Sequence, residues 1–382
     1  MTRAIEVLTA VLGVALVVVA VAANQAYLDR HFLPSFFIPR HWYVRIETLV
    51  RLFIGLAGAA LALARSRVGR VLTTAPGTAA RVMLAVVLAI VASEWALRSI
   101  GLRPTEWLVA EEEPRRQMDL QLGWVIAPNR TGHRTVAGRT VDYVMDAAGY
   151  RVSRPDEPVD VERPTIVFGG ESVMFGEGLA WDESIPAQTG ALLGIQSANL
   201  AVHGYSTDQI YLRLERELPK FRQPIAVVSI FMTELFGRNL DDDRPHLTDG
   251  LRWQPAVHSS RLSALAKLLV PFRREATVQR GVRVTHESLR AIVRLARARQ
   301  ATPLVIVPQF GDEDAAQRAL RTRILGNDVP SLLIQLDPDW RLAWDRHPNA
   351  RAAHVIASAI AERLRPSLST HAAPDAAPSS RY

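Results

Sequence analysis

Three long apolar stretches near the start of the chain constrain its fold more than any other feature. They cover about residues 4–23, 46–64 and 82–100, and each is long enough to cross a bilayer as a helix. Backbone polar groups inside a bilayer must be paired within the segment itself, so such stretches form helices. The second stretch is rich in glycine and alanine, which suits close helix packing. The sequence predicts a membrane domain over residues 1–105 with three transmembrane helices.

The arginines beside these spans predict their orientation. Arg3 precedes the first span, and further arginines follow the second at positions 65, 67, 70 and 81. The positive-inside rule places both groups in the cytoplasm, so the chain after the third span is extracytoplasmic. The connection between the first two spans also holds Arg30, Arg40 and Arg45 beside aromatic residues, a composition typical of the headgroup interface. We expect a multi-pass protein of the bacterial cytoplasmic (inner) membrane, with the lipid bilayer as a partner.

Two other interpretations of the spans stay open from the sequence. Ala20-Val21-Ala22 resembles a signal-peptide cleavage site, and cleavage there would leave the remainder of the chain on the same side. The spans are also compatible with buried core helices of a soluble protein.

Composition excludes several classes of function. The net charge is +7, from 45 Lys and Arg against 38 Asp and Glu, and the basic residues form no stripe with interleaved aromatics. We therefore expect no nucleic-acid partner. The chain has no cysteine, which excludes disulfides, thiol catalysis and cysteine-based metal sites.

The rest of the chain predicts an α/β fold. Residues 106–160 contain a linker and short alternating strands, including a hairpin over His133–Val144. Residues 161–366 alternate strands with helices. Several strands are continuous apolar runs, which predicts a parallel sheet covered on both faces in a three-layer α/β/α sandwich of flavodoxin-like type. The expected strands are 165–168, 197–200, 225–231, 303–307 and 331–334, and the expected helices are 184–193, 207–218, 286–299, 312–325 and 348–365. We expect a loop-and-helix insertion over residues 241–280 and a disordered tail over residues 367–382.

Two distant motifs suggest nucleophilic chemistry. The predicted strand at 165–168 runs into Gly169-Gly170-Glu171-Ser172, a turn that would expose a serine hydroxyl at the carboxyl end of the strand. Asp345-Arg346-His347 lies just before the last predicted helix. A serine hydroxyl needs a base to take its proton, and that base needs a fixed tautomer, so a carboxylate beside a histidine suits the role.

Together with the segment Asn199–Ser206, these motifs resemble the conserved blocks of the SGNH (GDSL-type) hydrolases. Glu171 stands where that family commonly has Asp. The family's third block brings an Asn-Asp pair after the 225–231 strand, whereas this chain has Thr233-Glu234. The resemblance covers about residues 118–366 and implies an SGNH hydrolase-like domain.

The resemblance also implies roles for individual residues. Ser172 is the expected nucleophile, His347 the base and Asp345 the residue that orients it. The backbone N–H groups of Ser172 and Gly204 are the expected oxyanion donors. The third donor is assigned to Thr233, with Asn239 as the alternative, because the family's asparagine is missing here. The expected pocket residues are His203, Glu171 and Trp344. A serine triad requires neither metal nor cofactor, and we expect none.

The function implied is a membrane-anchored, extracytoplasmic serine esterase. The favoured substrates are O-acyl groups, above all acetyl esters on cell-envelope carbohydrate, with small esters as simpler substrates. The same triad can transfer the acyl group to a sugar hydroxyl, so an O-acyltransferase is also compatible. The replacement at Thr233 and the three spans motivate an alternative to the leading esterase hypothesis: a non-catalytic or weakly active glycan-binding subunit that works with envelope-glycan assembly proteins.

Overall fold

The computed structural model describes residues 2–23, 27, 40–100, 112–257, 260–263 and 273–371. The chain divides into two compact units, Met1–Thr105 with His258–Glu275, and Glu106–Val257 with Ala276–Tyr382. Three predicted segments lie wholly or largely outside the described residues: most of the connection between the first two spans, the start of the linker at 106–111, and positions 372–382 of the tail.

The first unit contains α1 (Thr2–Ala22), α3 (Arg40–Leu63), α4 (Arg65–Thr74) and α5 (Pro76–Ser99). Segments of three of them, Thr2–Ala22, Val44–Leu63 and Pro76–Ser99, are long and apolar enough to span a membrane. Helices α3 and α5 each start six residues earlier than expected, and the basic connection between them forms α4. Large apolar side chains such as Leu8, Phe53 and Trp95 are exposed in this unit. This exposure argues against buried core helices and is compatible with insertion into lipid.

Glycines bring α1 and α3 into close contact. A Cβ on Gly13 would lie 2.6 Å from the Gly58 carbonyl oxygen, and a Cβ on Gly58 would lie 2.7 Å from that of Gly13. Both are far below van der Waals contact, so the two backbones can cross here only without side chains. The glycines of the second span therefore serve the close helix packing that its composition predicts.

The second unit is built on an eight-stranded sheet with the order β12-β11-β8-β6-β7-β5-β4-β3. Five strands are parallel, β6 (Thr165–Phe168), β7 (Gln196–Asn199), β8 (Pro224–Ile230), β11 (Thr302–Phe310) and β12 (Ser331–Leu336). In chain order these five run 2-1-3-4-5, which is the flavodoxin-like arrangement. The predicted fold class is confirmed. The strand order reverses between β6 and β8, and ligands of such sheets bind at that switch point, outside the carboxyl ends of the strands.

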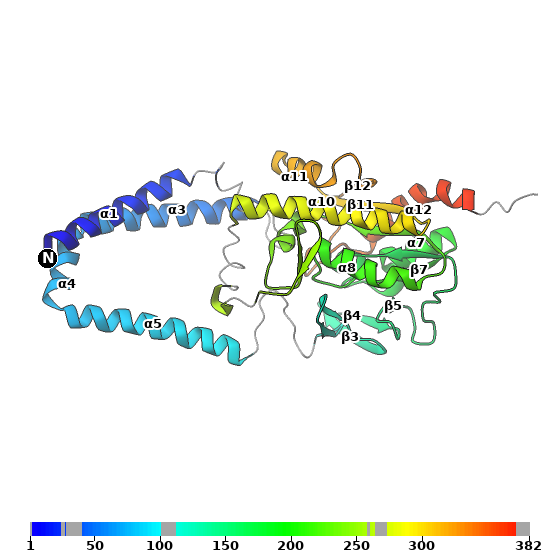
Figure 1. Ribbon diagram of the computed structural model, residues 1–382, viewed down its shortest axis with the longest axis horizontal. Helices are drawn as coiled ribbons and strands as arrows, with labels where there is room; N and C mark the ends of the chain where they lie inside the picture. Colours follow the sequence, from blue (N-terminus) through cyan, green and yellow to red (C-terminus); the bar gives the residue numbers. More distant parts are fainter. Residues whose placement is uncertain are drawn as a thin grey trace, which may run out of the picture. The chain divides into compact units, whose positions relative to one another are not determined.

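Helices cover both faces of this sheet (Figure 1). They are α6 (Ser172–Phe175), α7 (Ile185–Leu193), α8 (Thr207–Glu217), α10 (Glu275–Ala298), α11 (Ala315–Leu325) and α12 (Ala350–His371), with 3₁₀ turns η1 (Trp181–Glu183), η2 (Leu218–Lys220) and η3 (Thr233–Leu240). Helices α7 and α12 pack against each other, and His354 of α12 lies 2.7 Å from the side-chain oxygen of Gln188. Right-handed crossovers place α8, α10 and α11 on the opposite face.

Local sequence signals account for the helix ends. The Ser184 hydroxyl accepts the Ala187 N–H at the start of α7, and Gly194 ends that helix with a φ of +66°. Asp314 and Gln317 form a capping box at the start of α11. In α10 the apolar positions recur at helical spacing and are buried, so this helix presents one continuous stripe to the core.

The region before β6 differs from its prediction as a separate lead-in. Strands β3 (Arg130–Val136), β4 (Arg139–Met145) and β5 (Arg151–Val152) extend the main sheet, because β5 pairs with β7 at Arg151 and Asn199. Of the described strands that precede β6, β1 (Arg116–Asp119) and β2 (Gly123–Ile126) form a separate two-stranded sheet. The boundary expected at residue 160 is therefore wrong, since one sheet includes strands from both sides of it.

Two further boundaries also need correction. The expected insertion at 241–280 contains a short hairpin, β9 (His246–Thr248) with β10 (Arg252–Gln254), and α10 begins within it at Glu275. Helix α12 continues to His371. Residues 367–371 are therefore helical, although the sequence predicted that the disordered tail begins at residue 367.

Candidate active site

Strand β6 carries Ser172 to the carboxyl edge of the sheet. All four residues of the strand are buried, and Glu171 caps α6 by accepting the Val173 N–H at 3.1 Å. A Cβ on Gly169 would lie 2.7 Å from Leu214 Cδ1, and one on Gly170 would lie 2.3 Å from Met174 Cβ. A side chain at either position would force Leu214 or Met174 to shift. The turn that the sequence predicts places Ser172 at the first residue of the helix.

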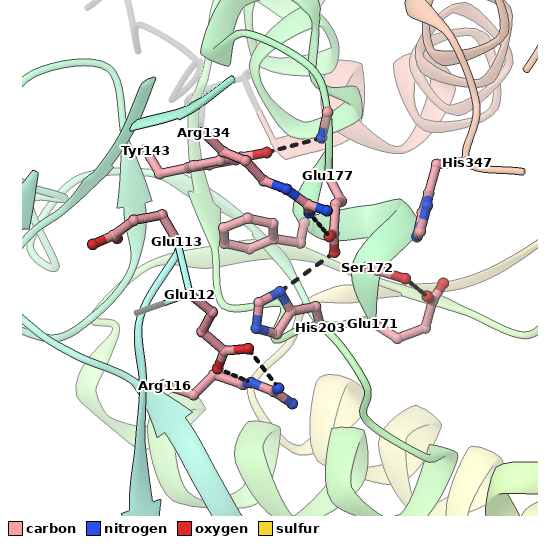
Figure 2. A network of polar contacts seen from close by, with 12 residues as sticks. Glu112, Glu113, Arg116, Arg134, Tyr143, Glu171, Ser172, Glu177, His203 and His347 are labelled. Carbon is pink, nitrogen blue, oxygen red and sulfur yellow. Dashed lines mark hydrogen bonds and ion pairs between the residues drawn. The ribbon is translucent and has the colours of Figure 1, made fainter. Parts of the chain in front are cut away.

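The Ser172 hydroxyl donates a hydrogen bond to Glu171 Oε2 at 2.8 Å (Figure 2). Ser172 is only 3% exposed, and among the described residues its side chain makes no other hydrogen bond. The hydroxyl proton is therefore directed at Glu171 and not at an imidazole. Proton transfer to a histidine requires the Ser172 side chain to rotate first.

His347 is held by Asp345, as the sequence motif led us to expect. Its Nδ1 lies 3.0 Å from Asp345 Oδ1, and the same oxygen accepts the His347 backbone N–H at 2.7 Å. Burial alone would lower the pKa of His347. The hydrogen bond to Asp345 and the negative charges of Glu177, Asp345 and Glu171 outweigh burial and raise that pKa. Burial raises the pKa of Asp345, but the contacts with His347 lower it overall.

His347 is near enough to the turn after β6 for carboxylates on both sides of Ser172 to act on it. The carboxylates of Glu171 and Glu177 both raise the pKa of His347, and Glu171 is the residue that binds the Ser172 hydroxyl. Figure 2 shows His347 together with Ser172 and Glu171. The fold has thus joined a turn after β6 and a loop after β12.

A second histidine–carboxylate pair lies near Ser172, and no sequence motif predicts it. His203 Nδ1 is 3.3 Å from Glu177 Oε2, and Arg134 of β3 donates to Glu177 Oε1 at 2.8 Å. Burial raises the pKa of Glu177, but the hydrogen bond from His203 and the charges of His203, His347 and Arg134 lower it overall. Glu177 lies in a loop and Arg134 in the strands before β6, so no local motif identifies either residue. His203 was expected as a pocket residue.

The two expected backbone oxyanion donors are both uncommitted in the described part of the chain. The Ser172 N–H belongs to the first turn of a helix, where such groups lack an intrahelical partner. Gly204 has a φ of +83°, and a Cβ there would lie 3.1 Å from Trp124. The peptide groups around Gly204 are fixed by side chains, because Trp124 donates to the His203 carbonyl at 3.1 Å and Arg244 to the Gly204 carbonyl at 2.7 Å.

The structure separates the two candidates for the third oxyanion donor. Thr233 is 4% exposed, and its hydroxyl finds no hydrogen-bond partner among the described residues. Asn239 instead uses its amide at the start of α8, where it accepts the Thr207 N–H at 2.7 Å and donates to Thr285 at 2.9 Å. Thr233 therefore has a donor to offer, whereas the Asn239 amide is engaged.

The loop with His347 is tied to the turn that follows β8. Glu234 of η3 lies 3.6 Å from Arg341 and 3.5 Å from Arg346, the arginines on either side of Asp345. Burial raises the pKa of Glu234 although both arginines oppose this effect. Trp344, expected as a pocket residue, is half-buried with its ring beside Gly178. Glu234 thus anchors the loop that bears His347.

The described residues contain no cluster of three or more His, Asp or Glu side chains that could hold a metal ion.

No protein-family model matches the chain. No curated protein sequence matches it either. Solved structures similar to it are GDSL-family lipolytic proteins and carbohydrate acetylesterases. A GDSL-family lipolytic protein from Desulfitobacterium hafniense is 12% identical, with a TM-score of 0.34 over 52% of this chain and 98% of the other. The acetyl xylan esterase Est2A of Butyrivibrio proteoclasticus is 11% identical, with a TM-score of 0.35 over 56% of this chain and 66% of the other. A carbohydrate acetylesterase family member from Sinorhizobium meliloti is 11% identical, with a TM-score of 0.32 over 54% of this chain and 99% of the other. At these values we base the function on the site itself.

Proposed function

We propose that this protein is a membrane-anchored serine esterase or acyltransferase that acts on O-acyl esters. The observation that supports the proposal is the position of Ser172 after β6, at the switch point of a flavodoxin-like sheet, next to Glu171, whose charge acts on the His347 that pairs with Asp345. The Nδ1–Oδ1 distance of 3.0 Å leaves His347 Nε2 as the atom that exchanges protons. This is the arrangement that a serine nucleophile requires.

In the first step Ser172 Oγ turns from Glu171 toward His347 and attacks the ester carbonyl carbon. Its proton passes to His347 Nε2, and the carbonyl electron pair moves to oxygen, where the N–H groups of Ser172 and Gly204 receive it. The imidazolium then protonates the departing alcohol, and Asp345 stabilises the positive charge. Water or a sugar hydroxyl then gives a proton to His347 and attacks the acyl-serine carbonyl carbon. The bond to Ser172 Oγ breaks, and Ser172 recovers its proton from His347. Hydrolysis and transfer thus share one set of residues.

The membrane unit supports an envelope substrate. The arginines beside α1, α3 and α4 favour the cytoplasmic side, so the catalytic unit is proposed to face outward from the cytoplasmic membrane. An outward-facing domain meets glycans and lipids of the cell envelope. We propose acetyl esters of cell-envelope carbohydrate as the substrate class.

A serine-directed probe tests this proposal. Purified full-length protein in detergent should label with a fluorophosphonate, and Ser172→Ala should abolish the label. Acetate release from an acetylated polysaccharide should be lost in Ser172→Ala and His347→Ala. Absence of labelling in the wild-type protein, or equal labelling of Ser172→Ala, would reject a serine nucleophile.

Two observations favour a second function, a non-catalytic glycan-binding subunit of an envelope-glycan assembly machine. The Ser172 hydroxyl is bonded to Glu171, and the family's third-block asparagine is replaced by Thr233. Binding of acetylated polysaccharide without acetate release, unchanged by Ser172→Ala, would support that function over the esterase.

A further inference from the structure

Arg238 lies beside the nucleophile and has no role in the proposed triad. It belongs to η3, which follows β8, and its Nη1 is 3.7 Å from Glu171 Oε2. That same oxygen accepts the Ser172 hydroxyl at 2.8 Å. A single carboxylate oxygen therefore contacts both the nucleophile and the guanidinium.

The donors of Arg238 are not committed to the protein. Its side chain is 19% exposed, and in the described ranges it makes no hydrogen bond. Among the described residues, Nη1 is buried without an acceptor, and Glu171 Oε1 is buried without a donor. A guanidinium carries five N–H donors and stays charged, so leaving them unpaired in a buried site is costly. Burial lowers the pKa of Arg238, and the charge of Glu171 opposes this effect. The site retains a charged donor that a ligand atom could satisfy.

The other arginines around the site have defined contacts. Arg134 is bonded to Glu177, Arg244 to the Gly204 carbonyl, and Arg341 and Arg346 lie beside Glu234. Arg238, like Arg346, has an ion pair that is too long for a hydrogen bond. Arg238 differs because its ion-pair partner is Glu171, the carboxylate that accepts the Ser172 hydroxyl.

We propose that Arg238 donates a hydrogen bond to the acyl carbonyl oxygen and serves as a third oxyanion donor with the N–H groups of Ser172 and Gly204. This inference rests on the proposed esterase function. In the step concerned, the Ser172 Oγ–carbon bond forms, the carbonyl π pair moves to oxygen, and the Ser172 proton passes to His347. Arg238 keeps all its protons and pairs with the oxyanion.

Two physical arguments favour this role over the alternatives. A charged donor binds an oxyanion more strongly than the neutral Thr233 hydroxyl does. A substrate carboxylate is a poorer ligand for Arg238, because Glu171 already places a negative charge 3.7 Å away. The oxyanion carries its charge only in the transition state, so Arg238 contributes to rate more than to ground-state binding.

The test compares full-length wild-type protein with Arg238→Met and Arg238→Lys on p-nitrophenyl acetate, a neutral ester. We expect Arg238→Met to lower kcat by about 10²–10³ with KM within about twofold, as for loss of a transition-state donor. Arg238→Lys should retain part of the rate. The rate of fluorophosphonate labelling should fall in parallel, because that reaction also places charge on oxygen. Arg283→Met is the matched control, since Arg283 pairs with Asp249 on an exposed surface, and its rate should equal that of the wild type.

A double variant separates this role from simple charge balance. If Arg238 only neutralises Glu171, then Glu171→Gln combined with Arg238→Met should regain the wild-type rate. We expect the double variant to stay slow, with circular dichroism confirming that it is folded.

Three results would overturn the inference: wild-type kcat in folded Arg238→Met, full recovery in the double variant, or a KM effect confined to an anionic ester such as p-nitrophenyl succinate. A wild-type protein that neither labels nor turns over esters would instead reject the proposed function itself.

Discussion

The dependence of activity on Asp345 gives the most direct test of the proposed chemistry. In the wild-type protein the His347 backbone N–H donates to Asp345 Oδ1 at 2.7 Å. The substitution Asp345→Asn keeps an oxygen that can accept this hydrogen bond. It removes the negative charge that lies 3.0 Å from Nδ1. The loop geometry should survive, while the imidazole loses the partner that fixes its tautomer and stabilises its positive charge.

The expected loss follows from that single change. In serine triads the equivalent substitution lowers kcat by about 10⁴, which corresponds to about 5.4 kcal/mol of transition-state stabilisation. Wild-type activity requires neutral His347, so kcat/KM should fall as the pH drops through the raised pKa of His347, above the ordinary value of 6.5. In Asp345→Asn the contribution of Asp345 to that pKa is gone and burial still lowers it, so the acid limb should move to lower pH.

The assay is the pH profile of kcat/KM on p-nitrophenyl acetate for both proteins, with thermal melting as the control for folding. A loss smaller than about tenfold with an unmoved acid limb would show that His347 does not act with Asp345 as the catalytic base.

Three other outcomes are expected. Thr233→Asn should raise kcat, by up to the factor of about 10²–10³ that one oxyanion donor contributes, when rates are compared on the same ester. Gly170→Ala should lower the free energy of unfolding by about 1–3 kcal/mol or more in urea denaturation, because its Cβ would lie 2.3 Å from Met174 Cβ. Folding lowers the pKa of Glu177. The Glu177 carboxylate therefore stabilises the folded protein at a pH above its pKa in the unfolded chain, and this stabilisation is lost as the pH falls toward its pKa in the folded protein. Glu177→Gln should therefore flatten the acid side of the stability profile.

Each of these has a result that contradicts it. An unchanged or lower rate in folded Thr233→Asn would place that side chain away from the oxyanion. A Gly170→Ala protein as stable as the wild type would mean that the turn after β6 relaxes freely. If the pH dependence of unfolding is identical for Glu177→Gln and wild type, then the charge of Glu177 does not contribute to the loss of stability in acid.

The amino-acid sequence alone determined those features that depend on neighbours in the chain. Apolar runs of membrane length predicted three helices, and the buried runs that became β6, β8 and β11 predicted a parallel sheet, because periodicity and length are local properties. The turn at Gly169 and Gly170 and the Asp345–His347 pair were also predictable, since each is formed within a few residues.

Only the tertiary structure decided how distant segments combine. Pairing of β5 with β7 merged the expected lead-in with the main sheet, and that pairing brought Arg134 to Glu177. The turn after β8 placed Arg238 against Glu171 and engaged Asn239 with α8, although the sequence left Asn239 open as an oxyanion donor. These contacts join residues that are far apart in the chain and depend on backbone paths and burial. A carboxylate or guanidinium acquires its partner, and hence its pKa and its role, only when the fold has removed it from water.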